Sequence, residues 1–464
     1  MADVLITHGL LITMNERRSI ISDGAVAIEK DRIIAVGKTK EVKSAHKGDI
    51  ELNAANKIIM PGLIDGHQHP TQYLSKGIGD DVSAQKWVYE RVFPYEAALT
   101  PEDCYVGALG SFVESVRHGT TTHNDPGVPG SLEHVDRVAS AMKEVGIRGI
   151  LARYTFDYEV EGFPVPDSLR LPTDEQLRLN EEVVRKWNGK NGDMIRAWFG
   201  WRLPINASDE LLVETKRLAD KYGVGMHTHA NMFREENEVM KKHFGYRSLE
   251  RYEKLGIIGP NLYLVHMGWT TPQEIRMLKR HDAKVCHCPT SSMHNCYGCI
   301  CHGTFPEMIA QGLTVTLGCD SATCGRTLDM LFVAYLAACA HKDATLDPLA
   351  VGPHKALEMA TIDCAKGLMW EDKIGSIEVG KRADIITVDL ESPEWWPMRD
   401  VVANLVYSGD AGHVDNVIVN GKFVMRDRQI VTLDEGEVIK KVREIADAAV
   451  ERAGVKIRPR WKVF

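Results

Sequence analysis

The sequence lacks any long hydrophobic run: no apolar stretch approaches the roughly 18 residues that a membrane-spanning helix needs. The first nine residues have neither the basic segment nor the apolar core of a signal peptide. Blocks of basic residues are also missing, and 56 Lys and Arg stand against 64 Asp and Glu, for a formal net charge of −8. We therefore expect a cytoplasmic protein that binds a small molecule and neither nucleic acid nor a membrane.

What is present is the composition of an ordinary globular protein, with 44% hydrophobic and 26% charged residues. The 464 residues suffice for about three average domains or for one large α/β barrel with insertions. Histidine (18) and cysteine (10) are both abundant, and seven of the cysteines lie between Cys286 and Cys324. A disulfide-rich secreted scaffold would be short, so we interpret these cysteines as reduced thiols.

Both ends of the chain are rich in short β-type segments. Residues 24–37 predict a hairpin with its turn at Lys30-Asp31, and no helix is expected in roughly the first 55 residues. The same pattern returns near the other end, where residues 375–388 and 414–424 each predict a pair of strands. These segments predict one small β domain to which both termini contribute.

The middle of the chain alternates apolar strands with helices. Eight short runs have this character: Ile58–Gly66, Gly119–Asp125, Gly146–Arg153, Ile195–Arg202, Gly223–Ala230, Asn261–Met267, Ala283–Pro289 and Leu313–Asp320. Such an alternation predicts parallel strands covered by helices, and eight units predict a closed (β/α)8 barrel.

The sequence therefore predicts an α/β protein made of a (β/α)8 TIM barrel and a small composite β-sandwich domain formed by both termini. The expected boundaries are 1–57 for the N-terminal part of the β domain, 58–370 for the barrel and 371–430 for the C-terminal part of the β domain. Residues 431–464 are expected to form a helix, over about 435–453, and a tail.

Several of the predicted barrel strands end in a residue that can bind a metal ion: His67 and His69, His229, His266 and Asp320. The carboxyl ends of parallel barrel strands form one mouth, and a strand period of two places His67 and His69 on the same side. Imidazoles and a carboxylate around an open position suit a catalytic zinc or a similar divalent ion. His227 should lie one layer deeper than His229, outside the metal shell. An ordinary strand-end histidine at 266 and a helix N-cap at Asp320 remain alternatives.

Five blocks of the sequence resemble the amidohydrolase superfamily. Residues 61–69, Pro-Gly-Leu-Ile-Asp-Gly-His-Gln-His, resemble its first-strand signature, and four further blocks follow in the same order: Gly119–Thr122, Cys288–Met293, Leu317–Asp320 and Gly375–Asp384. The resemblance covers nearly the whole chain. The branch that it resembles contains purine, cytosine and triazine aminohydrolases together with phenylurea and molinate (thiocarbamate) hydrolases.

This resemblance implies that one divalent metal ion per subunit is bound by His67, His69, His229 and Asp320, and that His266 is a proton shuttle. Zinc is the first expectation, and cobalt, iron or manganese are the alternatives. It also implies a homo-oligomer. A bound ion lowers the pKa of its water towards about 7, and Asp320 can take the water's proton, so the expected reaction is attack by a metal-bound hydroxide on an electron-poor carbon.

Two departures from the pattern of the branch bear on the substrate. Aminohydrolases of the branch usually carry Glu three residues after the third ligand histidine, and here that position is Met232, which cannot move a proton. The usual His-Ala-Pro-Tyr segment is replaced by Arg202-Leu203-Pro204-Ile205, where Arg202 binds a polar substrate atom or forms a structural ion pair. We therefore expect cleavage of a C–N or C–S bond at a urea-, carbamate-, thiocarbamate- or amide-type carbon of a small uncharged molecule.

Two other functions remain open. One is an aminohydrolase (deaminase) that releases ammonia from a purine, pterin or triazine-like heterocycle. The other is a metal-bound but non-catalytic binding protein, against which the complete set of catalytic residue types argues. Trp87, His294, Arg202 and Met232 are the expected substrate contacts. The cysteines of residues 286–301 have the spacing of a structural metal site, but an apolar lining of the barrel mouth explains them as well.

Overall fold

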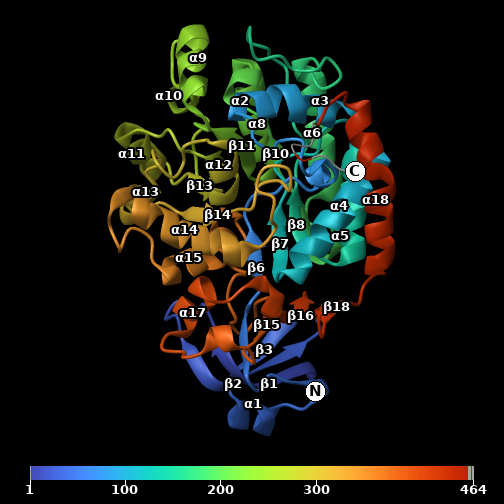
Figure 1. Ribbon diagram of the computed structural model, residues 1–464, viewed down its shortest axis with the longest axis vertical. Helices are drawn as coiled ribbons and strands as arrows, with labels where there is room; N and C mark the ends of the chain where they lie inside the picture. The colour runs from blue at the N-terminus through green and yellow to red at the C-terminus, as the bar shows by residue number, and fades with distance from the viewer. Residues whose placement is uncertain (1, 458–460, 462–464) are drawn as a thin grey trace.

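Both ends of the chain contribute strands to one mixed sheet, as Figure 1 shows at its lower end. The computed structural model describes residues 2–457 and 461. The order of the main path is β18-β17-β16-β15-β5-β1-β2-β3, and β4 pairs with β1 beside it. The strands are β1 (Ala2–Ile12), β2 (Ile20–Glu29), β3 (Arg32–Lys38), β4 (Gly48–Asn53), β5 (Lys57–Pro61), β15 (Ile385–Asp389), β16 (Val414–Val419), β17 (Lys422–Arg426) and β18 (Gln429–Ile430).

The terminal sheet is apolar on both of its faces, and one face is covered by a helix that was not expected from the sequence. Alternate residues of β1, such as Leu5 and Ile6, point to opposite faces, and each face has its own buried apolar cluster. Helix α1 (Thr39–Ala45) covers one face with Val42, so the first 55 residues do contain a helix. Seven residues make two turns at most, too few for a helical period to stand out.

The predicted hairpins agree with the structure in two of three cases. Strands β2 and β3 turn at Lys30, which has a positive φ of 54°, and β16 and β17 form the second hairpin. The expectation of two strands in residues 375–388 was wrong, because only β15 forms there, and residues 375–384 contain bends, a turn at Val379-Gly380 and a single β-bridge from Arg382 to Arg32. Gly375 and Gly380, with φ of 87° and 91°, supply left-handed turns that interrupt a strand.

The eight predicted runs in the middle of the chain all contain strands of two parallel sheets. One sheet has the order β6-β7-β8-β9 and the other β10-β11-β12-β13-β14. Their bounds are β6 (Leu63–Asp65), β7 (Thr120–Asn124), β8 (Arg148–Leu151), β9 (Ile195–Ala197), β10 (Phe199–Gly200), β11 (Met226–Ala230), β12 (Leu262–His266), β13 (Lys284–His287) and β14 (Val315–Leu317). The run Ile58–Gly66 is divided, since β5 belongs to the terminal sheet and β6 to the first parallel sheet.

The two parallel sheets adjoin at both of their edges. Strands β9 and β10 are separated only by Trp198, whose backbone N–H donates to the Leu151 carbonyl. At the other edge, the N–H of Gly66 donates to the Leu317 carbonyl at 2.9 Å, and the N–H of Asp320 to the His67 carbonyl at 2.8 Å. The ends of β6 and β14 are therefore held beside each other, although some 250 residues separate them in the chain.

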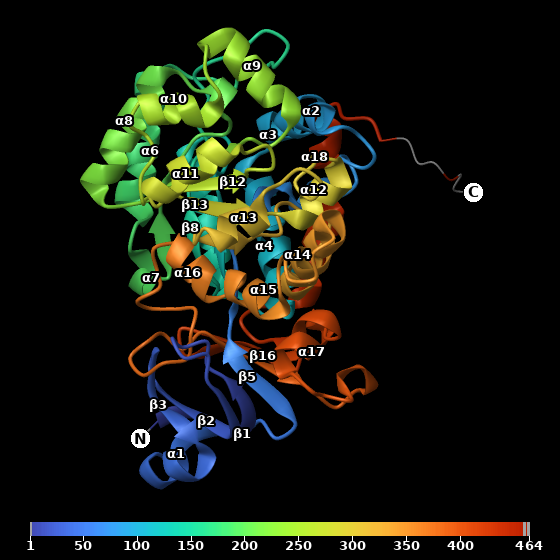
Figure 2. The same ribbon diagram turned by 90° about the vertical axis from the view of Figure 1, so that its left-hand side faces the viewer.

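Helices surround the parallel strands, and Figures 1 and 2 show them above the terminal sheet. Helix α4 (Pro101–Arg117) has Thr100 as its N-cap and Pro101 in its first turn, and a capping box joins Thr100 to Asp103. The expected C-terminal helix is present as α18, which runs along α4. The α-helices of the parallel-strand part are α2 (Ala84–Trp87), α3 (Phe93–Ala98), α4 (Pro101–Arg117), α5 (Leu132–Val145), α6 (Thr173–Trp187), α7 (Lys190–Asp193), α8 (Asp209–Tyr222), α9 (Arg234–Phe244), α10 (Ser248–Lys254), α11 (Pro272–Arg280), α12 (Pro289–Asn295), α13 (Phe305–Ala310), α14 (Met330–Thr345), α15 (Pro353–Met359) and α16 (Ile362–Gly367). Two helices come later in the chain: α17 (Val401–Tyr407) follows β15, and α18 (Glu435–Arg452) follows β18.

A buried ion pair joins the terminal sheet to the parallel strands. Arg148 of β8 donates to both carboxylate oxygens of Asp384, at 2.7 and 3.1 Å, and both side chains are almost completely buried. Across the described residues, no helix is long and apolar enough to cross a membrane.

Candidate metal centre and active site

Five of the predicted site residues lie together at the carboxyl ends of the parallel strands. They are His67, His69, His229, His266 and Asp320, and each is at most 3% exposed. Two of them leave their strands in a left-handed backbone conformation, with φ of 75° at His266 and 61° at Asp320. This conformation is unfavourable for a residue with a side chain and is held here by the surrounding structure, which is common at functional sites.

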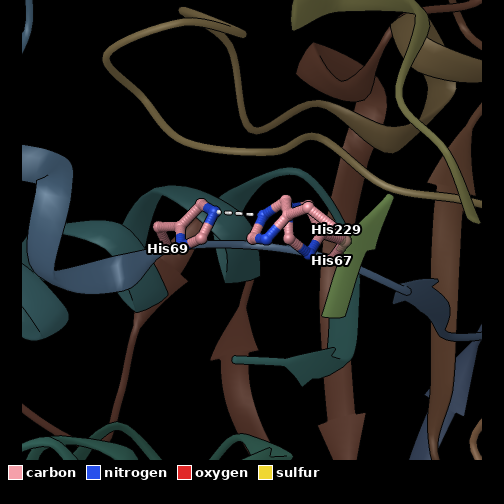
Figure 3. Close-up of side chains that lie close together, drawn as sticks. All are labelled: His67, His69 and His229. Carbon is pink, nitrogen blue, oxygen red and sulfur yellow. Dashed lines mark hydrogen bonds between the residues drawn. The ribbon is translucent and has the colours of Figure 1, made fainter. Parts of the chain in front are cut away.

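The imidazole nitrogens face one another and the carboxylate of Asp320. The Nε2 atoms of His69 and His229 are 3.3 Å apart, a contact drawn as a dashed line in Figure 3. Asp320 Oδ1 is 3.4 Å from Nε2 of His69 and 3.6 Å from Nε2 of His67. Two ligands about 2.1 Å from a zinc ion in a tetrahedral site lie roughly 3.4 Å apart. His67 Nε2 and Asp320 Oδ2 are buried without a hydrogen-bond partner. The donor set and its spacing fit a divalent ion.

Each of the three imidazoles has its other ring nitrogen bound to the protein. Nδ1 of His229 lies 2.9 Å from the backbone carbonyl of Arg202, Nδ1 of His69 lies 3.1 Å from Tyr154 Oη, and Nδ1 of His67 lies 3.1 Å from Nε2 of His227. Burial lowers the pKa of all three rings, so they are neutral and offer a lone pair. Hydrogen bonds of this kind orient metal-binding histidines in proteins.

Asp320 and His266 lie side by side within the cluster. Nε2 of His266 is 3.8 Å from Asp320 Oδ2, and neither ring nitrogen of His266 has a hydrogen-bond partner. Burial lowers the pKa of His266 to about 3, against the opposing charge of Asp320. Burial alone would raise the pKa of Asp320, but the neighbouring imidazoles hold it well below its usual range. Asp320 is not the N-cap of α14, a role that Asp329 fills.

Arg202 places a buried positive charge beside the imidazoles. Its guanidinium hydrogen-bonds Tyr154 Oη, lies 3.3 Å from Nδ1 of His69 and pairs with Glu96 at 3.4 Å. Burial lowers the pKa of Arg202, but Glu96 and Tyr154 outweigh this, so the side chain stays charged. Arg202 therefore forms the structural ion pair that was one of its two expected roles. Its guanidinium also contacts His69 of the cluster.

Met232 is buried in the loop after β11, and no carboxylate takes its place. Glu236, on the first turn of α9, accepts the backbone N–H groups of Asn231 and Met232 at 2.8 and 3.1 Å. It also accepts the hydroxyl of Ser248 at 2.9 Å. These bonds occupy both oxygens of Glu236, which therefore supports the loop.

The remaining two expected substrate contacts lie further from the cluster. Trp87 is buried and packs against the ring of Tyr297, which in turn packs against His266 with ring centroids 5.1 Å apart. His294 is partly exposed and lies 3.3 Å from Asp80. Trp87 is therefore one ring away from the cluster, whereas no contact joins His294 to it among the described residues.

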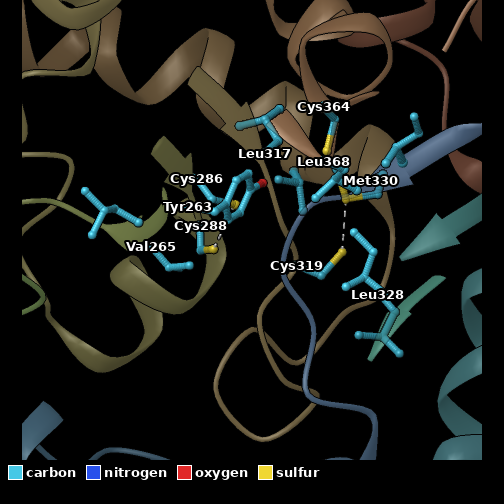
Figure 4. Packing of buried hydrophobic residues seen from close by; sticks show 14 of the residues in the cluster. Tyr263, Val265, Cys286, Cys288, Leu317, Cys319, Leu328, Met330, Cys364 and Leu368 are labelled. Carbon is cyan, nitrogen blue, oxygen red and sulfur yellow. Dashed lines mark hydrogen bonds between the residues drawn. The ribbon is translucent and has the colours of Figure 1, made fainter. Parts of the chain in front are cut away.

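No cysteine belongs to a group of three close potential metal ligands among the described residues, since those groups contain only His, Asp and Glu. All ten are free, and seven are buried, as the reduced thiols expected from the sequence would be. Figure 4 shows Cys286, Cys288, Cys319 and Cys364 packed among apolar side chains. Sγ of Cys319 lies 3.4 Å from Sδ of Met330. These thiols pack as small apolar side chains, as buried free cysteines commonly do.

Three site residues were not predicted as such from the sequence. Tyr154 follows the third parallel strand and had a usable signal, its position at a strand end. His227 was noticed but given no role. Glu96 lies in α3, where an acid in an apolar helix carries no sign of its buried partner.

The cluster, set at the carboxyl ends of parallel strands in an α/β fold, defines a metal-dependent hydrolase. The chain belongs to the Amidohydrolase family, which it matches over residues 58–424. It is 31% identical over 456 residues to a 5'-deoxyadenosine deaminase of Methanosarcina mazei, covering 97% of this chain and 99% of that one. It is 33% identical to a 5-methylthioadenosine/S-adenosylhomocysteine deaminase of Moorella thermoacetica, covering 91% and 94%.

Solved structures show the same fold. A zinc-bound adenosine deaminase from Xanthomonas campestris has a TM-score of 0.86 and 26% identity, covering 97% of this chain and 98% of that one. An atrazine chlorohydrolase from Arthrobacter aurescens in complex with zinc has a TM-score of 0.87 at 22% identity, covering 96% and 100%. The chain is thus a metal-dependent hydrolase enzyme of this family, and the alternative of a non-catalytic binding protein is set aside.

Proposed function

We propose that this enzyme is an aminohydrolase that releases ammonia from the adenine ring of a 5'-substituted adenosine. The observation that carries the proposal is the full-length similarity to deaminases of 5'-deoxyadenosine and of 5-methylthioadenosine. The expectation of a urea- or carbamate-type substrate thereby becomes the second candidate.

The proposed site holds one divalent ion, with zinc as the first choice, on His67, His69, His229 and Asp320. A bound ion of this kind lowers the pKa of a water molecule towards about 7 and so supplies the nucleophile near neutral pH. Asp320 is an ionised acceptor in position to take the proton of the attacking water. His266, neutral and without another partner, can hydrogen-bond the leaving nitrogen and relay the proton that ammonia needs.

The charge balance of the site favours an uncharged substrate. Arg202 is neutralised by Glu96, and among the described residues no other cation contacts the cluster. A charged substrate group buried there would lack a free counter-ion and would carry the cost of its desolvation. A nucleoside without a phosphate satisfies this condition.

One observation favours the second candidate, amine release from a urea, carbamate, thiocarbamate or amide. Attack on a purine ring is assisted when an acid protonates the ring nitrogen, and Met232 cannot do so while Glu236 is bound to the loop backbone. A carbonyl substrate needs no such protonation. It instead develops an anionic oxygen, which the guanidinium of Arg202 can stabilise.

A substrate panel separates the two candidates. Ammonia is measured from adenosine, 5'-deoxyadenosine and methylthioadenosine, and free amine from a phenylurea, a thiocarbamate and a simple anilide, each with zinc-loaded and chelator-treated protein. We expect metal-dependent ammonia release from the nucleosides. Amine release without any ammonia would overturn the deaminase proposal and leave the second candidate.

Replacing Met232 by glutamate tests the missing acid directly. A positioned general acid contributes about 10²–10⁴-fold to a rate, so Met232→Glu should raise kcat/KM for nucleoside deamination at least tenfold. Met232→Gln is the matched control, since it has the same length and no proton to give. An equal response of both variants would mean that ring protonation does not limit the rate.

Four further features of the protein stay proposals. We propose that the two parallel sheets form one closed (β/α)8 barrel, which is supported by the backbone hydrogen bonds at both of their edges. The terminal sheet is proposed as the composite domain of residues 1–57 and 371–430. A homo-oligomer and a cytoplasmic location are the third and fourth.

A further inference from the structure

We propose that His227 is a positioning residue of the metal centre, which keeps His67 in the tautomer that can bind the ion. This inference depends on the proposed metal site and is independent of the substrate. His227 lies in β11 two residues before His229, so both side chains leave the strand on the same side. It is completely buried.

Among the described residues, the His227 ring has one hydrogen bond, which joins it to His67. Its Nε2 lies 3.1 Å from Nδ1 of His67, while its Nδ1 has no partner. The ring of Tyr263 packs edge-on against it, with centroids 5.1 Å apart. Within the same part of the chain, Nδ1 of His67 hydrogen-bonds His227 alone.

A single proton is shared between the two nitrogens, and its place decides what His67 can do. If His67 carries it on Nδ1 and donates to His227, then Nε2 of His67 keeps a free lone pair facing Asp320, 3.6 Å away. If His227 donates instead, the proton of neutral His67 sits on Nε2, and that nitrogen cannot bind a metal ion. Metal binding therefore requires His227 to be the acceptor and to carry its own proton on Nδ1.

The tautomer of His67 depends on its contact more than the tautomer of His229 does. His229 is held by a backbone carbonyl, which can only accept, and His69 by Tyr154 Oη. A carbonyl fixes the tautomer of its partner without any choice, whereas a second imidazole can donate or accept. Loss of the His227 ring would leave the buried Nδ1–H of His67 without an acceptor, which disfavours the ligand tautomer.

The test compares two side chains of different reach. In His227→Gln the amide oxygen can occupy the position of Nε2 and accept from His67, whereas the shorter His227→Asn does not reach. The dissociation constant for zinc is measured by competition with a chromophoric chelator, on metal-stripped protein without substrate. We expect His227→Asn to bind zinc 10–100-fold more weakly than wild type, and His227→Gln to stay within about threefold.

A control separates positioning from general damage to the core. His123 is another fully buried neutral histidine in a parallel strand, and neither of its ring nitrogens has a partner. His123→Asn should leave zinc affinity within about threefold of wild type. Equal zinc affinity of His227→Asn, His227→Gln and wild type would overturn the inference. Wild type that binds no zinc would instead overturn the proposed metal site itself.

Discussion

The imidazoles of the cluster illustrate how burial and hydrogen bonding combine at single residues. An isolated histidine side chain titrates near pH 6.5, but the buried rings of His69 and His229 have a pKa well below this value. Each ring is therefore neutral at neutral pH and has a lone pair to offer. No proton needs to leave these rings before they bind the proposed ion, which favours tight metal binding.

Asp320 is the residue whose replacement should affect the chemistry most directly. Asp320→Asn keeps the shape of the side chain but removes the ionised acceptor, so turnover should fall by about 10²–10⁴-fold. The measurement is kcat at saturating zinc, with the zinc content checked on the same sample. A near-normal kcat with bound zinc would show that another group takes the proton.

His123 allows a pH effect to be assigned to one buried ring. Burial lowers its pKa to about 3, so below pH 6.5 the unfolded chain binds a proton there that the folded protein does not. Stability from this site is present above pH 6.5 and is lost as the pH falls towards 3. The free energy of unfolding of wild type relative to His123→Leu should therefore fall by about 1 kcal/mol between pH 7.5 and 5.5.

That difference is measured by urea unfolding of both metal-free proteins at the two pH values. A constant difference across the range would mean that His123 titrates with the same pKa in the folded and the unfolded protein. The comparison isolates His123 because buried carboxyl groups with raised pKa, such as Asp65 and Asp125, are common to both proteins and cancel.

Residue by residue, the sequence could indicate the site where strand ends carry the chemistry. His67, His69, His229, His266 and Asp320 were expected together, and the structure has them together. The partners Glu96, Tyr154 and His227 could not be paired from the sequence, because their contacts depend on side-chain directions across different elements. Counting three residues from His229 placed Met232 at the position where the family usually has glutamate. That count could not show that Glu236 hydrogen-bonds the backbone of the same loop.

At the scale of elements, the loop between β11 and α9 is fixed by one buried carboxylate. Glu236 accepts two backbone N–H groups and one hydroxyl, and this loop directly follows His229. Burial raises the pKa of Glu236, although its hydrogen bonds with the backbone N–H groups lower it. The protonation of this carboxyl group therefore depends on the residues packed around it. The loop therefore couples the position of a metal-binding strand end to the start of α9.

Removing that carboxylate should destabilise the protein and weaken the site. Glu236→Ala leaves three buried donors without an acceptor, so the free energy of unfolding should drop by at least about 2 kcal/mol. Zinc affinity should fall as well, because the backbone N–H groups of Asn231 and Met232, just after β11, lose their acceptor. The neighbouring exposed Glu235→Ala is the control and should change stability by less than about 0.5 kcal/mol. Equal stability of the two variants would contradict this role.

Elements were predictable where the residue pattern is long or strongly apolar. All eight runs of the middle contain strands, and α18 (Glu435–Arg452) lies close to its predicted bounds of about 435–453. Helix α1 was not predicted because it is short. A strand was wrongly predicted in residues 375–384, because isolated apolar residues between glycines resemble a strand. The division between β5 and β6 depends on tertiary pairing, which no local pattern contains.

At the scale of the whole molecule, Arg148 and Asp384 join the parallel strands to the terminal sheet. Asp384 also accepts the backbone N–H of Asn420 at 2.7 Å. Asp384→Ala leaves the guanidinium of Arg148 buried without its carboxylate and should lower the free energy of unfolding by about 3–5 kcal/mol. Urea unfolding measures this loss.

An exposed ion pair supplies the comparison for that variant. Glu175 and Arg178 of α6 pair at the surface at 2.8 Å, so Glu175→Ala should cost less than about 1 kcal/mol. Because Asp384 lies far from the cluster in the chain and contacts none of its residues, zinc affinity of the folded Asp384→Ala protein should equal that of wild type. Similar losses in both variants would mean that the junction contributes little.

The pairing of β5 with β15 has a consequence for the synthesis of the protein. Five residue pairs join these strands, yet residues 62–384 separate them in the chain. At about 5–20 residues per second, the edge of β5 waits roughly 15–65 s on the ribosome for its partner. An apolar strand edge without a partner is a template for aggregation. The nascent chain therefore depends on shielding of Ile58, Ile59 and Met60 during that interval.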